Sequence, residues 1–413
     1  MNYVIIGNGP AGVHAIESIR QRDPNGTITL ISKEDTAPYS RIMLPELVSG
    51  EIEDAYLYYR GTDFYERYAV NCKLGKTVAE IVCNEKKLVL KDGETICYDK
   101  LLIASGSSPV ILPFAQNPPK GVFSLWNKAD AQEIREYLAH KEFNGNPSHI
   151  VIVGGGLVGL QAARALAGPG KDITLIVNSR RSRPRLMPSQ LDETASKMLA
   201  EAAEKAGVRV LCDAKVEALH AADGKVTGVK SDHGLFPAQL VLVATGVRPN
   251  LDFAVGKGLD IGGALKVNEE MRCNIPDIFA AGDVAEAFGL LEETNVMRPL
   301  WLCAVQQGKI AGTNMAGGSM RYEGSLAMNS IDLFGLPIVS VGKLGGAEIE
   351  ELCIHPPVNG IYKKLFLQQG KLVGFILVGD IQQAGILASK LGQVMGENYS
   401  GEYKNLDPAF YYA

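Results

Sequence analysis

Residues Val4–Gly12 read Val-Ile-Ile-Gly-Asn-Gly-Pro-Ala-Gly, and residues Val151–Gly159 repeat the pattern as Val-Ile-Val-Gly-Gly-Gly-Leu-Val-Gly. An apolar run that ends in Gly-x-Gly-x-x-Gly is typical of a strand, a tight turn and the start of a helix. In such a turn the second glycine lets the backbone approach a phosphate, and the helix N-terminus presents free N–H groups. The two stretches therefore predict two sites for pyrophosphate groups.

Two further pairs of segments repeat around these turns. Residues Ile28–Ile31 return as Ile173–Ile176, and Leu101–Gly106 returns as Val241–Gly246. Three landmarks that recur at nearly constant spacing indicate an internal duplication, and each copy reads as strand, turn, helix and strand. The sequence therefore predicts an α/β fold that contains two copies of one nucleotide-binding unit.

The pattern between and beyond these landmarks predicts further elements. In the first helix, Val13, Ile16 and Ile19 share one face. A second helix is expected over Leu160–Ala167 and a third near Leu302. We expect strands at Thr27–Ser32, Val78–Val82, Lys87–Leu90, Thr95–Tyr98, Tyr362–Gln368 and Leu372–Val378, and a helical tail from Ile381.

Composition excludes several classes of protein. The 413 residues are 46% hydrophobic and 21% charged, which provides a sizeable core and argues against disorder. The formal net charge of −5 offers no bulk basic surface for nucleic acid, and no apolar run is long enough for a membrane span. The 45 glycines, present without collagen periodicity, are expected at tight turns and where backbone approaches a ligand.

The cysteines and the N-terminus bear on location. Seven cysteines are present, and no two have Cys-x-x-Cys spacing. We therefore expect neither a disulfide framework nor a zinc or iron–sulfur site, and interpret the cysteines mainly as small buried residues in a reducing cytoplasm. The chain enters a strand pattern at once, without the segments of a signal peptide. The expected location is cytoplasmic.

An acidic residue after the second strand of such a unit should bind ribose hydroxyls. Glu34 has this position in the first copy, and the alternative is a solvated loop acid. The second copy has no acid there, and the stretch Val177–Arg183 contains Asn178 and Arg180 instead. Arginines favour a 2′-phosphate and hence NADPH, whereas a solvated basic loop would leave NADH open.

The chain resembles a known family through these turns and two other features. They are the paired Ala-Ser-Gly and Ala-Thr-Gly at 104–106 and 244–246, and Ala281-Gly282-Asp283. Together they resemble two-dinucleotide flavoproteins related to the pyridine nucleotide–disulfide oxidoreductases. Within this family, the chain is most similar to NAD(P)H:rubredoxin oxidoreductases and to the flavin modules of NADH-dependent nitrite reductases. The matching segments are Tyr39-Ser40-Arg41, Tyr362-Lys363-Lys364, Leu372-Val373-Gly374 and Val378-Gly379-Asp380.

The resemblance implies an α/β architecture of two duplicated Rossmann-like dinucleotide-binding domains and a small α+β C-terminal domain. We expect a discontinuous FAD-binding domain over residues 1–112 and 245–319. An NAD(P)-binding domain is expected over 113–244, followed by an interface domain over 320–413. Such C-terminal domains often form dimer contacts, and the sequence leaves a homodimer open.

The resemblance also implies FAD as a bound cofactor on the first Gly-rich turn. Asp283 would accept hydrogen bonds from the ribityl chain or interact with the adjoining phosphate, although a helix-capping aspartate is the alternative. The helix at Leu302–Ala311 would direct its N-terminus at the isoalloxazine O2. The residues expected around FAD are Gly7, Gly9, Pro10, Ala11, Gly12, Glu34, Arg41, Val78, Ser105, Gly106, Gly282, Asp283 and Ala304.

NADH or NADPH would bind as a substrate on the second Gly-rich turn. Many relatives place a glutamate two residues after the last glycine, near the nicotinamide and the flavin, where this chain has Gln161. The residues expected around this nucleotide are Gly154, Gly156, Leu157, Val158, Gly159, Asn178, Arg180 and Gly246.

One departure from the family determines the predicted chemistry. Disulfide reductases carry redox cysteines soon after the ribose-binding acid, but Tyr39–Leu47 contains none, so dithiol chemistry has no nucleophile. We interpret Cys303, beside the expected flavin-facing helix, as a structural residue. The cofactors would therefore carry the chemistry, without a catalytic side chain.

The leading hypothesis is a flavoprotein oxidoreductase that passes a hydride from NAD(P)H to FAD, and then electrons to a small redox protein such as rubredoxin, a ferredoxin or an iron–sulfur subunit. The alternatives are an NAD(P)H oxidase that uses O2 and an FAD-binding regulatory protein. The sequence leaves open the acceptor, the preferred nucleotide and the direction of electron flow.

Overall fold

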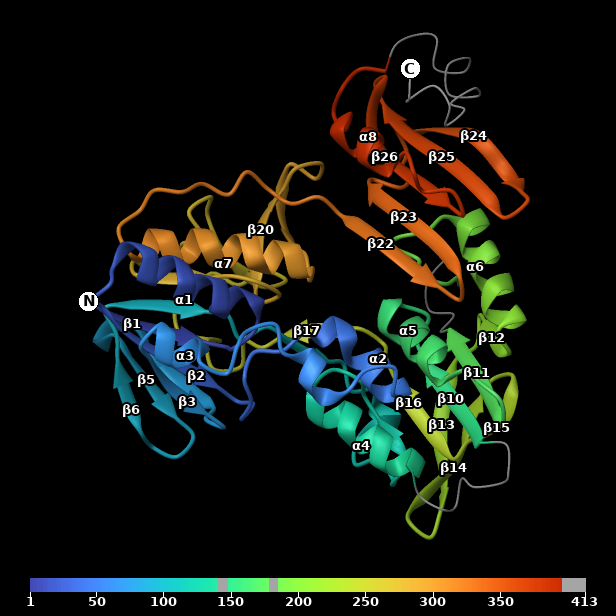
Figure 1. Cartoon of the computed structure of the whole chain (residues 1–413), viewed down its shortest axis with the longest axis horizontal. Helices are drawn as coiled ribbons and strands as arrows, with labels where there is room; N and C mark the ends of the chain where they lie inside the picture. Colours follow the sequence, from blue (N-terminus) through green and yellow to red (C-terminus); the bar gives the residue numbers. More distant parts are fainter. Residues whose placement is uncertain (140–147, 178–184, 396–413) are drawn as a thin grey trace. The chain divides into compact units, whose positions relative to one another are not determined.

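The computed structural model describes residues 1–139, 148–177 and 185–395 of the chain. The chain divides into two compact units (Figure 1). Unit 1 comprises Met1–Ile42, Glu53–Ser108 and Val247–Leu326, and unit 2 comprises Met43–Ile52, Pro109–Gly246 and the residues from Ala327 onward.

A five-stranded parallel sheet forms the centre of unit 1, in the order β19-β7-β1-β2-β3. Ile5 in β1 lies opposite Leu30 of β2 and Leu102 of β7, and all three side chains are fully buried. A parallel sheet buried on both faces requires such continuous apolar strands. The strands are β1 (Asn2–Ile6), β2 (Thr27–Ser32), β3 (Val70–Leu74), β7 (Lys100–Ile103) and β19 (Ile278–Ala280).

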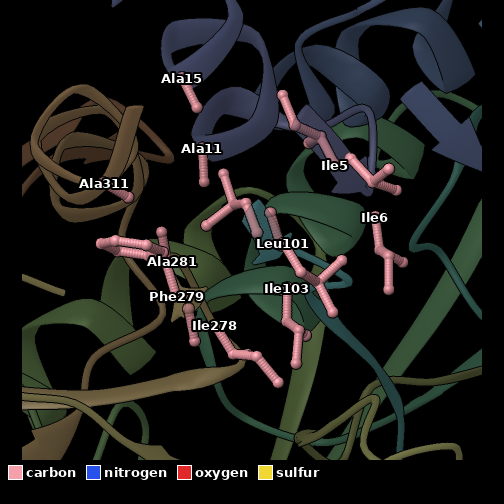
Figure 2. Packing of buried hydrophobic residues seen from close by; sticks show 14 of the residues in the cluster. Ile5, Ile6, Ala11, Ala15, Leu101, Ile103, Ile278, Phe279, Ala281 and Ala311 are labelled. Carbon is pink, nitrogen blue, oxygen red and sulfur yellow. The ribbon is translucent and has the colours of Figure 1, made fainter. Parts of the chain in front are cut away.

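Two closely packed helices cover part of this sheet, α1 (Pro10–Arg22) and α7 (Trp301–Met315). As predicted, Val13, Ile16 and Ile19 of α1 are fully buried. Figure 2 shows the small side chains of α1 and α7 beside the branched and aromatic side chains of the sheet. Glycines of α7 face the backbone of α1, which lets the two helices approach more closely than larger residues would allow.

Smaller elements complete unit 1. An antiparallel meander inserted between β3 and β7 confirms three predicted strands: β4 (Val78–Val82), β5 (Lys87–Leu90) and β6 (Thr95–Cys97). A second small sheet contains β18 (Leu265–Lys266), β20 (Ala285–Gly289) and β21 (Thr294–Met297). The remaining elements are η1 (Arg41–Met43), η2 (Asp54–Leu57), α3 (Phe64–Arg67), η3 (Cys83–Glu85) and the paired strands β8 (Ser107–Pro109) and β17 (Val247–Pro249).

Unit 2 contains a second five-stranded parallel sheet, in the order β12-β11-β10-β16-β9. Its strands are β9 (Val122–Phe123), β10 (Ser148–Val153), β11 (Lys171–Val177), β12 (Val208–Cys212) and β16 (Leu240–Val243). An antiparallel meander precedes β16, as the meander of unit 1 precedes β7. Its strands are β13 (Val216–Ala222), β14 (Lys225–Ser231) and β15 (Gly234–Pro237). The other elements are α2 (Leu44–Ser49), η4 (Pro113–Ala115), α4 (Lys128–Ala139), α5 (Leu157–Leu166) and α6 (Glu193–Lys205).

The two parallel sheets confirm the predicted duplication. Strands β1, β2 and β7 contain the first set of landmarks, and β10, β11 and β16 contain the second set in the same spatial order. The fifth strands differ, because β19 follows the second copy in the chain whereas β9 precedes it.

The C-terminal part is an antiparallel sheet, β22-β23-β26-β25-β24, accompanied by a short helix. The predicted hairpin is confirmed as β25 (Ile361–Gln368) and β26 (Lys371–Val378). The predicted helix starts three residues later than expected and is short, α8 (Ala384–Ser389), because a turn at Ile381 precedes it. The other strands are β22 (Met328–Leu333), β23 (Leu336–Gly342) and β24 (Glu350–Val358). Among the described residues, no helix is long and apolar enough to cross a membrane.

Candidate nucleotide-binding sites

The first Gly-rich turn, between β1 and α1, is fixed by backbone packing. Gly7 has a φ of +112°, and a Cβ on it would lie 2.0 Å from the carbonyl oxygen of Ala104. A Cβ on Gly12 would lie 2.0 Å from the oxygen of Gly7. A Cβ on Gly9, in contrast, would have no atom within 4 Å. Two of the glycines are therefore needed for packing, and the middle one borders open space through which a phosphate could reach the backbone.

The second turn, between β10 and α5, has the same geometry. Gly154 has a φ of +125°, and its Cβ would lie 2.2 Å from the oxygen of Ala244. A Cβ on Gly159 would lie 2.0 Å from the oxygen of Gly154, and Gly156 borders open space. The N–H of the first glycine donates to the end of the second strand in both copies, over 2.8 Å. Both predicted phosphate cradles are thus formed in the same way.

The helices that follow the turns begin without a side-chain cap among the described residues. Gly9 and Gly156 are the N-cap residues, and no described side chain caps either helix. Neither first turn contains an acidic residue, and basic residues lie in the last turns. Free N–H groups and the positive end of the helix dipole favour an anion at each start. The predicted residues Pro10 and Ala11 of α1, and Leu157 and Val158 of α5, lie in these first turns.

The predicted ribose acid and Arg41 lie together. Oε1 of Glu34 accepts from the Arg41 guanidinium, and Oε2 accepts from the Tyr39 hydroxyl over 2.6 Å. The guanidinium also lies 5.4 Å from the Tyr39 ring centroid. A carboxylate can accept about four hydrogen bonds, so Glu34 keeps capacity for ligand hydroxyls beside these donors. Neither this pairing nor the contact with Tyr39 follows from the sequence pattern.

Asn8, between the first two glycines, was also missed. Its Nδ2 donates to the carbonyl oxygen of Thr36 over 2.9 Å and to the Tyr65 hydroxyl over 2.7 Å. Its Oδ1 is buried and has no partner among the described residues. Asn8 therefore fastens the Gly-rich turn to the loop that follows Glu34. The sequence could have pointed to Asn8, because the equivalent residue of the second copy, Gly155, has no side chain.

The Ala-Ser-Gly segment after β7 is held by Asn250. The Ser105 hydroxyl donates to the carbonyl oxygen of Asn250 over 2.9 Å, and Nδ2 of Asn250 donates to the Ser105 oxygen over 2.8 Å. The Asn250 N–H also donates to the oxygen of Gly106. These bonds fix Ser105 and Gly106 at the carboxyl end of the sheet, where ligands bind in such folds.

Asp283 lies beside these residues in a largely desolvated position. The Ser107 hydroxyl donates to its Oδ2 over 2.5 Å. Burial raises the pKa of Asp283, while the Ser107 hydrogen bond and the charge of Arg41 act in the opposite direction. The N–H of Gly282 donates to the buried Oε1 of Gln307 over 2.8 Å. Ser107 and Gln307, which the sequence analysis did not identify, therefore set the position of this turn.

The Gly282–Asp283 turn lies at the junction of α1 and α7. A Cβ on Gly282 would lie 3.4 Å from the Cβ of Ala11 and 3.6 Å from that of Ala304. Three of the predicted FAD residues, Ala11, Gly282 and Ala304, thus come together in unit 1. This convergence was expected only from the resemblance, because Ala11 lies far from the other two residues in the sequence.

Helices α1 and α7 run in the same direction, and the N-terminus of α7 extends past the N-terminus of α1. A Cβ on Gly308 would lie 2.2 Å from the oxygen of Ala11, and one on Gly312 would lie 2.5 Å from that of Ala15. Since α7 starts at Trp301, its N-terminus extends about six residues, or ~9 Å, beyond that of α1. No described side chain caps α7, and its first turn has no acid. Unit 1 therefore presents two staggered positive helix ends.

The other predicted residues have less distinctive surroundings. Val78 is buried in β4 opposite Leu90, Gln161 lies on α5, and the Gly246 carbonyl accepts from the Val110 N–H. Asn178 and Arg180 lie outside the described residues, so the predicted preference for NADPH stays a prediction. Burial raises the pKa of the Cys303 thiol, which disfavours a reactive thiolate. The seven cysteines are free, and the described residues contain no cluster suited to a metal ion.

Two family models match the chain. A model described as pyridine nucleotide-disulphide oxidoreductase matches residues 1–308, and one described as rubredoxin NAD+ reductase C-terminal domain matches residues 328–393. The crystal structure of a covalent putidaredoxin reductase–putidaredoxin complex superimposes with a TM-score of 0.85 at 24% identity, over 94% of this chain and 92% of that chain. This likeness shows the fold.

Curated relatives are similar along almost the whole chain. A nitrite reductase [NAD(P)H] of Bacillus subtilis is 32% identical over 94% of this chain and 47% of its own length. An assimilatory nitrate reductase electron transfer subunit of the same organism is 29% identical over 94% and 49%. An NADH oxidase of Methanocaldococcus jannaschii is 30% identical over 92% and 88%. The chain thus spans about half the length of the first two relatives.

Proposed function

The chain belongs to the pyridine nucleotide-disulphide oxidoreductase family, and from this premise we propose that it is a flavoprotein reductase that delivers electrons to a small redox protein. Members of this family bind FAD and use NAD(P)H. We assign FAD to the first Gly-rich turn and the nicotinamide nucleotide to the second. We also propose the domain bounds expected from the sequence, residues 1–112 with 245–319, 113–244 and 320–413, although the compact units place Met43–Ile52 in unit 2 and extend unit 1 to Leu326.

The staggered helix ends of unit 1 carry the assignment of FAD. The open space at Gly9 and the free N–H groups of α1 suit a pyrophosphate. The N-terminus of α7, ~9 Å further along, suits an electron-rich ring. The buried acceptor Asp283 lies at the junction of the two helices and suits the hydroxyls of the chain between phosphate and ring. The residues present therefore fit an extended flavin dinucleotide.

Each residue of this site would bind or orient. Glu34 would accept hydrogen bonds from the adenosine ribose, while Tyr39 and Arg41 hold its carboxylate in place. Ser107 and Gln307 would keep Asp283 aimed at the ribityl hydroxyls. Three further residues complete the set that we assign to FAD. Val78 would provide an apolar contact, and Ser105 and Gly106 would provide fixed backbone at the end of the sheet.

The second turn would bind the exchangeable nucleotide. Gly156 and the first turn of α5 would hold its pyrophosphate, and Gly246 would lie beside it. Gln161 would orient the nicotinamide carboxamide by hydrogen bonding. Asn178 and Arg180 would bind the adenosine side, with Arg180 able to pair with a 2′-phosphate.

When bound, FAD supplies the electron chemistry, accepting a hydride from the nicotinamide and releasing electrons singly. The chain contributes no acid, base or thiol to this exchange in the proposed scheme. The acceptor would be a small electron-carrier protein, a proposal supported by the matching rubredoxin reductase domain and by the electron transfer subunit among the relatives. We also propose a cytoplasmic location, in keeping with seven unpaired cysteines.

The similar NADH oxidase supports a second candidate, transfer of electrons to O2. The two are separated by reducing the holoprotein anaerobically with one equivalent of NADH, then mixing it with rubredoxin, with a [2Fe–2S] ferredoxin or with air-saturated buffer. We expect fast reoxidation by a protein carrier and slow reoxidation by O2. Fast reoxidation by O2 alone would favour the oxidase, and no reduction by NADH or NADPH would favour an FAD-binding regulatory protein.

A further inference from the structure

Strand β25 presents different partners on its two faces. Leu365 and Leu367 pack with Leu387 of α8 in one apolar cluster, and Lys363 on the same face donates to Asp380 over 2.6 Å. Tyr362 and Lys364 alternate with them and therefore point to the opposite face of the sheet. Tyr362 and Lys364 belong to the segment Tyr362-Lys363-Lys364 on which the predicted resemblance rests, and the proposed function gives them no role.

Tyr362 and Lys364 converge on one carboxylate at the start of α6. The Tyr362 hydroxyl donates to Oδ2 of Asp192 over 2.6 Å, and Nζ of Lys364 donates to the same oxygen over 3.1 Å. Oδ1 of Asp192 accepts from the Ala195 N–H over 2.9 Å and so caps α6. The side chains of Asp192 and Lys364 are each only 14% exposed. One largely buried carboxylate therefore fastens the C-terminal sheet to a helix of the nucleotide-binding part of unit 2.

The charges around Lys364 make the loss of Asp192 costly in free energy. Nζ of Lys364 also lies 2.6 Å from Oε2 of Glu351. Burial lowers the pKa of Lys364, but the hydrogen bonds to Glu351 and Asp192 more than offset this, and the pKa is raised overall. Removing one partner of a buried ion pair leaves a desolvated charge, which is more costly than losing a surface pair. Asp192 is thus held by both electrostatics and geometry.

Helix α6 is connected in turn to the second Gly-rich turn. The hydroxyl of Ser196, one turn after Asp192, accepts from the Leu186 N–H over 2.9 Å, and both residues are buried. The next N–H, that of Met187, donates to the carbonyl oxygen of Gly155 over 2.8 Å. The Leu186 side chain also fills the space beside Gly155, with Cδ2 3.1 Å from the position of a Cβ. Hydrogen bonds thus lead from β25 through α6 to the phosphate cradle.

We propose that Asp192 is a positioning residue through which the C-terminal sheet sets the affinity of the second Gly-rich turn for the nicotinamide nucleotide. The inference rests on the proposed function, because it assigns that nucleotide to this turn. Tyr362 and Lys364 hold Asp192, Asp192 holds the first turn of α6, and Ser196 places Leu186 and Met187 against Gly155. Because binding couplings are reciprocal, the bound nucleotide would also tighten the attachment of the sheet.

The test uses the FAD-loaded full chain and variants on the two faces of β25. Tyr362→Phe removes one bond to Asp192, and Asp192→Ser keeps a residue able to cap α6 while withdrawing the carboxylate from Tyr362 and Lys364. Asp380→Asn is the matched control, because it disturbs a lysine–aspartate pair of the same sheet on the face away from α6. Each variant is assayed for KM and kcat with NADH and an artificial electron acceptor.

We expect Tyr362→Phe to raise KM by about fivefold, as for the loss of one hydrogen bond, and Asp192→Ser to raise it further. Neither should change kcat, and Asp380→Asn should leave KM unchanged. In the protein without nucleotide, amide hydrogen exchange at Leu186 and Met187 should accelerate in Tyr362→Phe and Asp192→Ser but not in Asp380→Asn.

Equal effects of Asp192→Ser and Asp380→Asn would overturn the inference, because they would indicate general loosening of the sheet. Unchanged KM and exchange in Tyr362→Phe and Asp192→Ser would overturn it as well. These outcomes leave the proposed function intact when wild-type protein is reduced by NADH. A wild-type protein that binds neither NAD+ nor NADP+ would instead overturn the proposed function and, with it, this inference.

Discussion

The two Gly-rich turns share their backbone geometry but are fastened by different means. In the first, the Asn8 side chain reaches the Thr36 carbonyl and the Tyr65 hydroxyl. In the second, Gly155 has no side chain, and its carbonyl instead accepts from the Met187 N–H while Leu186 fills the vacant space. Duplication has thus kept the residues that shape the cradle and changed the residue that ties it to its surroundings.

The loops after the second strands differ in the same sense. Glu34 in the first copy is held by Tyr39 and Arg41 within a network of polar side chains. Beyond Val177, the described part of the second copy is held by backbone bonds and by α6, whose N-cap residue Asp192 accepts a hydrogen bond from Tyr362 of the C-terminal sheet. The difference suits a permanently bound dinucleotide on the first turn and an exchanging one on the second.

Replacing the third glycine of each turn should have the largest effect and should separate the two sites. In Gly12→Ala, the new Cβ would clash with the Gly7 oxygen, so we expect a loss of about 3 kcal/mol of unfolding free energy and protein purified without flavin. In Gly159→Ala, the equivalent clash lies in the other copy, so flavin should be retained and reduction by NADH lost. Visible absorbance and urea unfolding measure both effects.

Gly9→Ala and Gly156→Ala are the matched controls, because neither Cβ meets a neighbour. They should change the free energy of unfolding by less than about 0.5 kcal/mol. Gly9→Ala should weaken the binding of FAD, and Gly156→Ala should weaken the binding of the nicotinamide nucleotide. Flavin loss in Gly159→Ala together with retention in Gly12→Ala would contradict the assignment of the two turns.

Exchanging the residues between the first two glycines should have an intermediate effect. Asn8→Gly loses two hydrogen bonds, and we expect the FAD-loaded protein to lose about 2 kcal/mol of stability and to release flavin faster. Gly155→Asn would place a Cβ 2.7 Å from Cγ2 of Val177. The second turn should therefore not accommodate the asparagine side chain that fastens the first. Flavin release after dilution and NADH titration report the two outcomes. An Asn8→Gly variant that holds flavin as tightly as wild type would show that the tether is irrelevant to retention.

Acid should lower the stability of the first parallel sheet slightly more than that of the second. The hydrogen bonds from Lys100 and Lys86 hold the pKa of Asp277 below its usual range. A lowered pKa in the folded state adds stability above the unfolded pKa, about 3.9, and this is lost as pH falls through the folded value. Leu240 stands where the second copy matches Lys100, so no equivalent ion pair forms there.

The expected contribution is below about 1 kcal/mol, because the pair is partly exposed. Asp277→Asn, which tolerates the positive φ of this residue, should flatten the decline of the urea midpoint between pH 5 and pH 3, taken as roughly the window around a carboxyl pKa. A decline as steep as that of wild type would contradict this origin of the acid sensitivity.

The sequence predicted the parts of this structure that depend on local pattern. Glycine spacing and apolar runs located both turns, the main strands and the buried face of α1. The missed residues act over long distances: Ser107 reaches Asp283, Gln307 reaches Gly282, and Tyr362 reaches Asp192. Such side-chain pairs follow from how the elements pack, which no local pattern encodes. The difference between Asn8 and Gly155 was visible, but its meaning required the partners that the fold supplies.

The most direct test of the two-turn account is anaerobic stopped-flow spectroscopy of the purified protein mixed with NADH or, separately, with NADPH. We expect the protein to be yellow with bound FAD and at least one nucleotide to bleach the flavin absorbance rapidly, with a rate that saturates with nucleotide concentration. The faster nucleotide would also settle the role of the segment that contains Arg180. A bound flavin that neither nucleotide reduces would contradict the account.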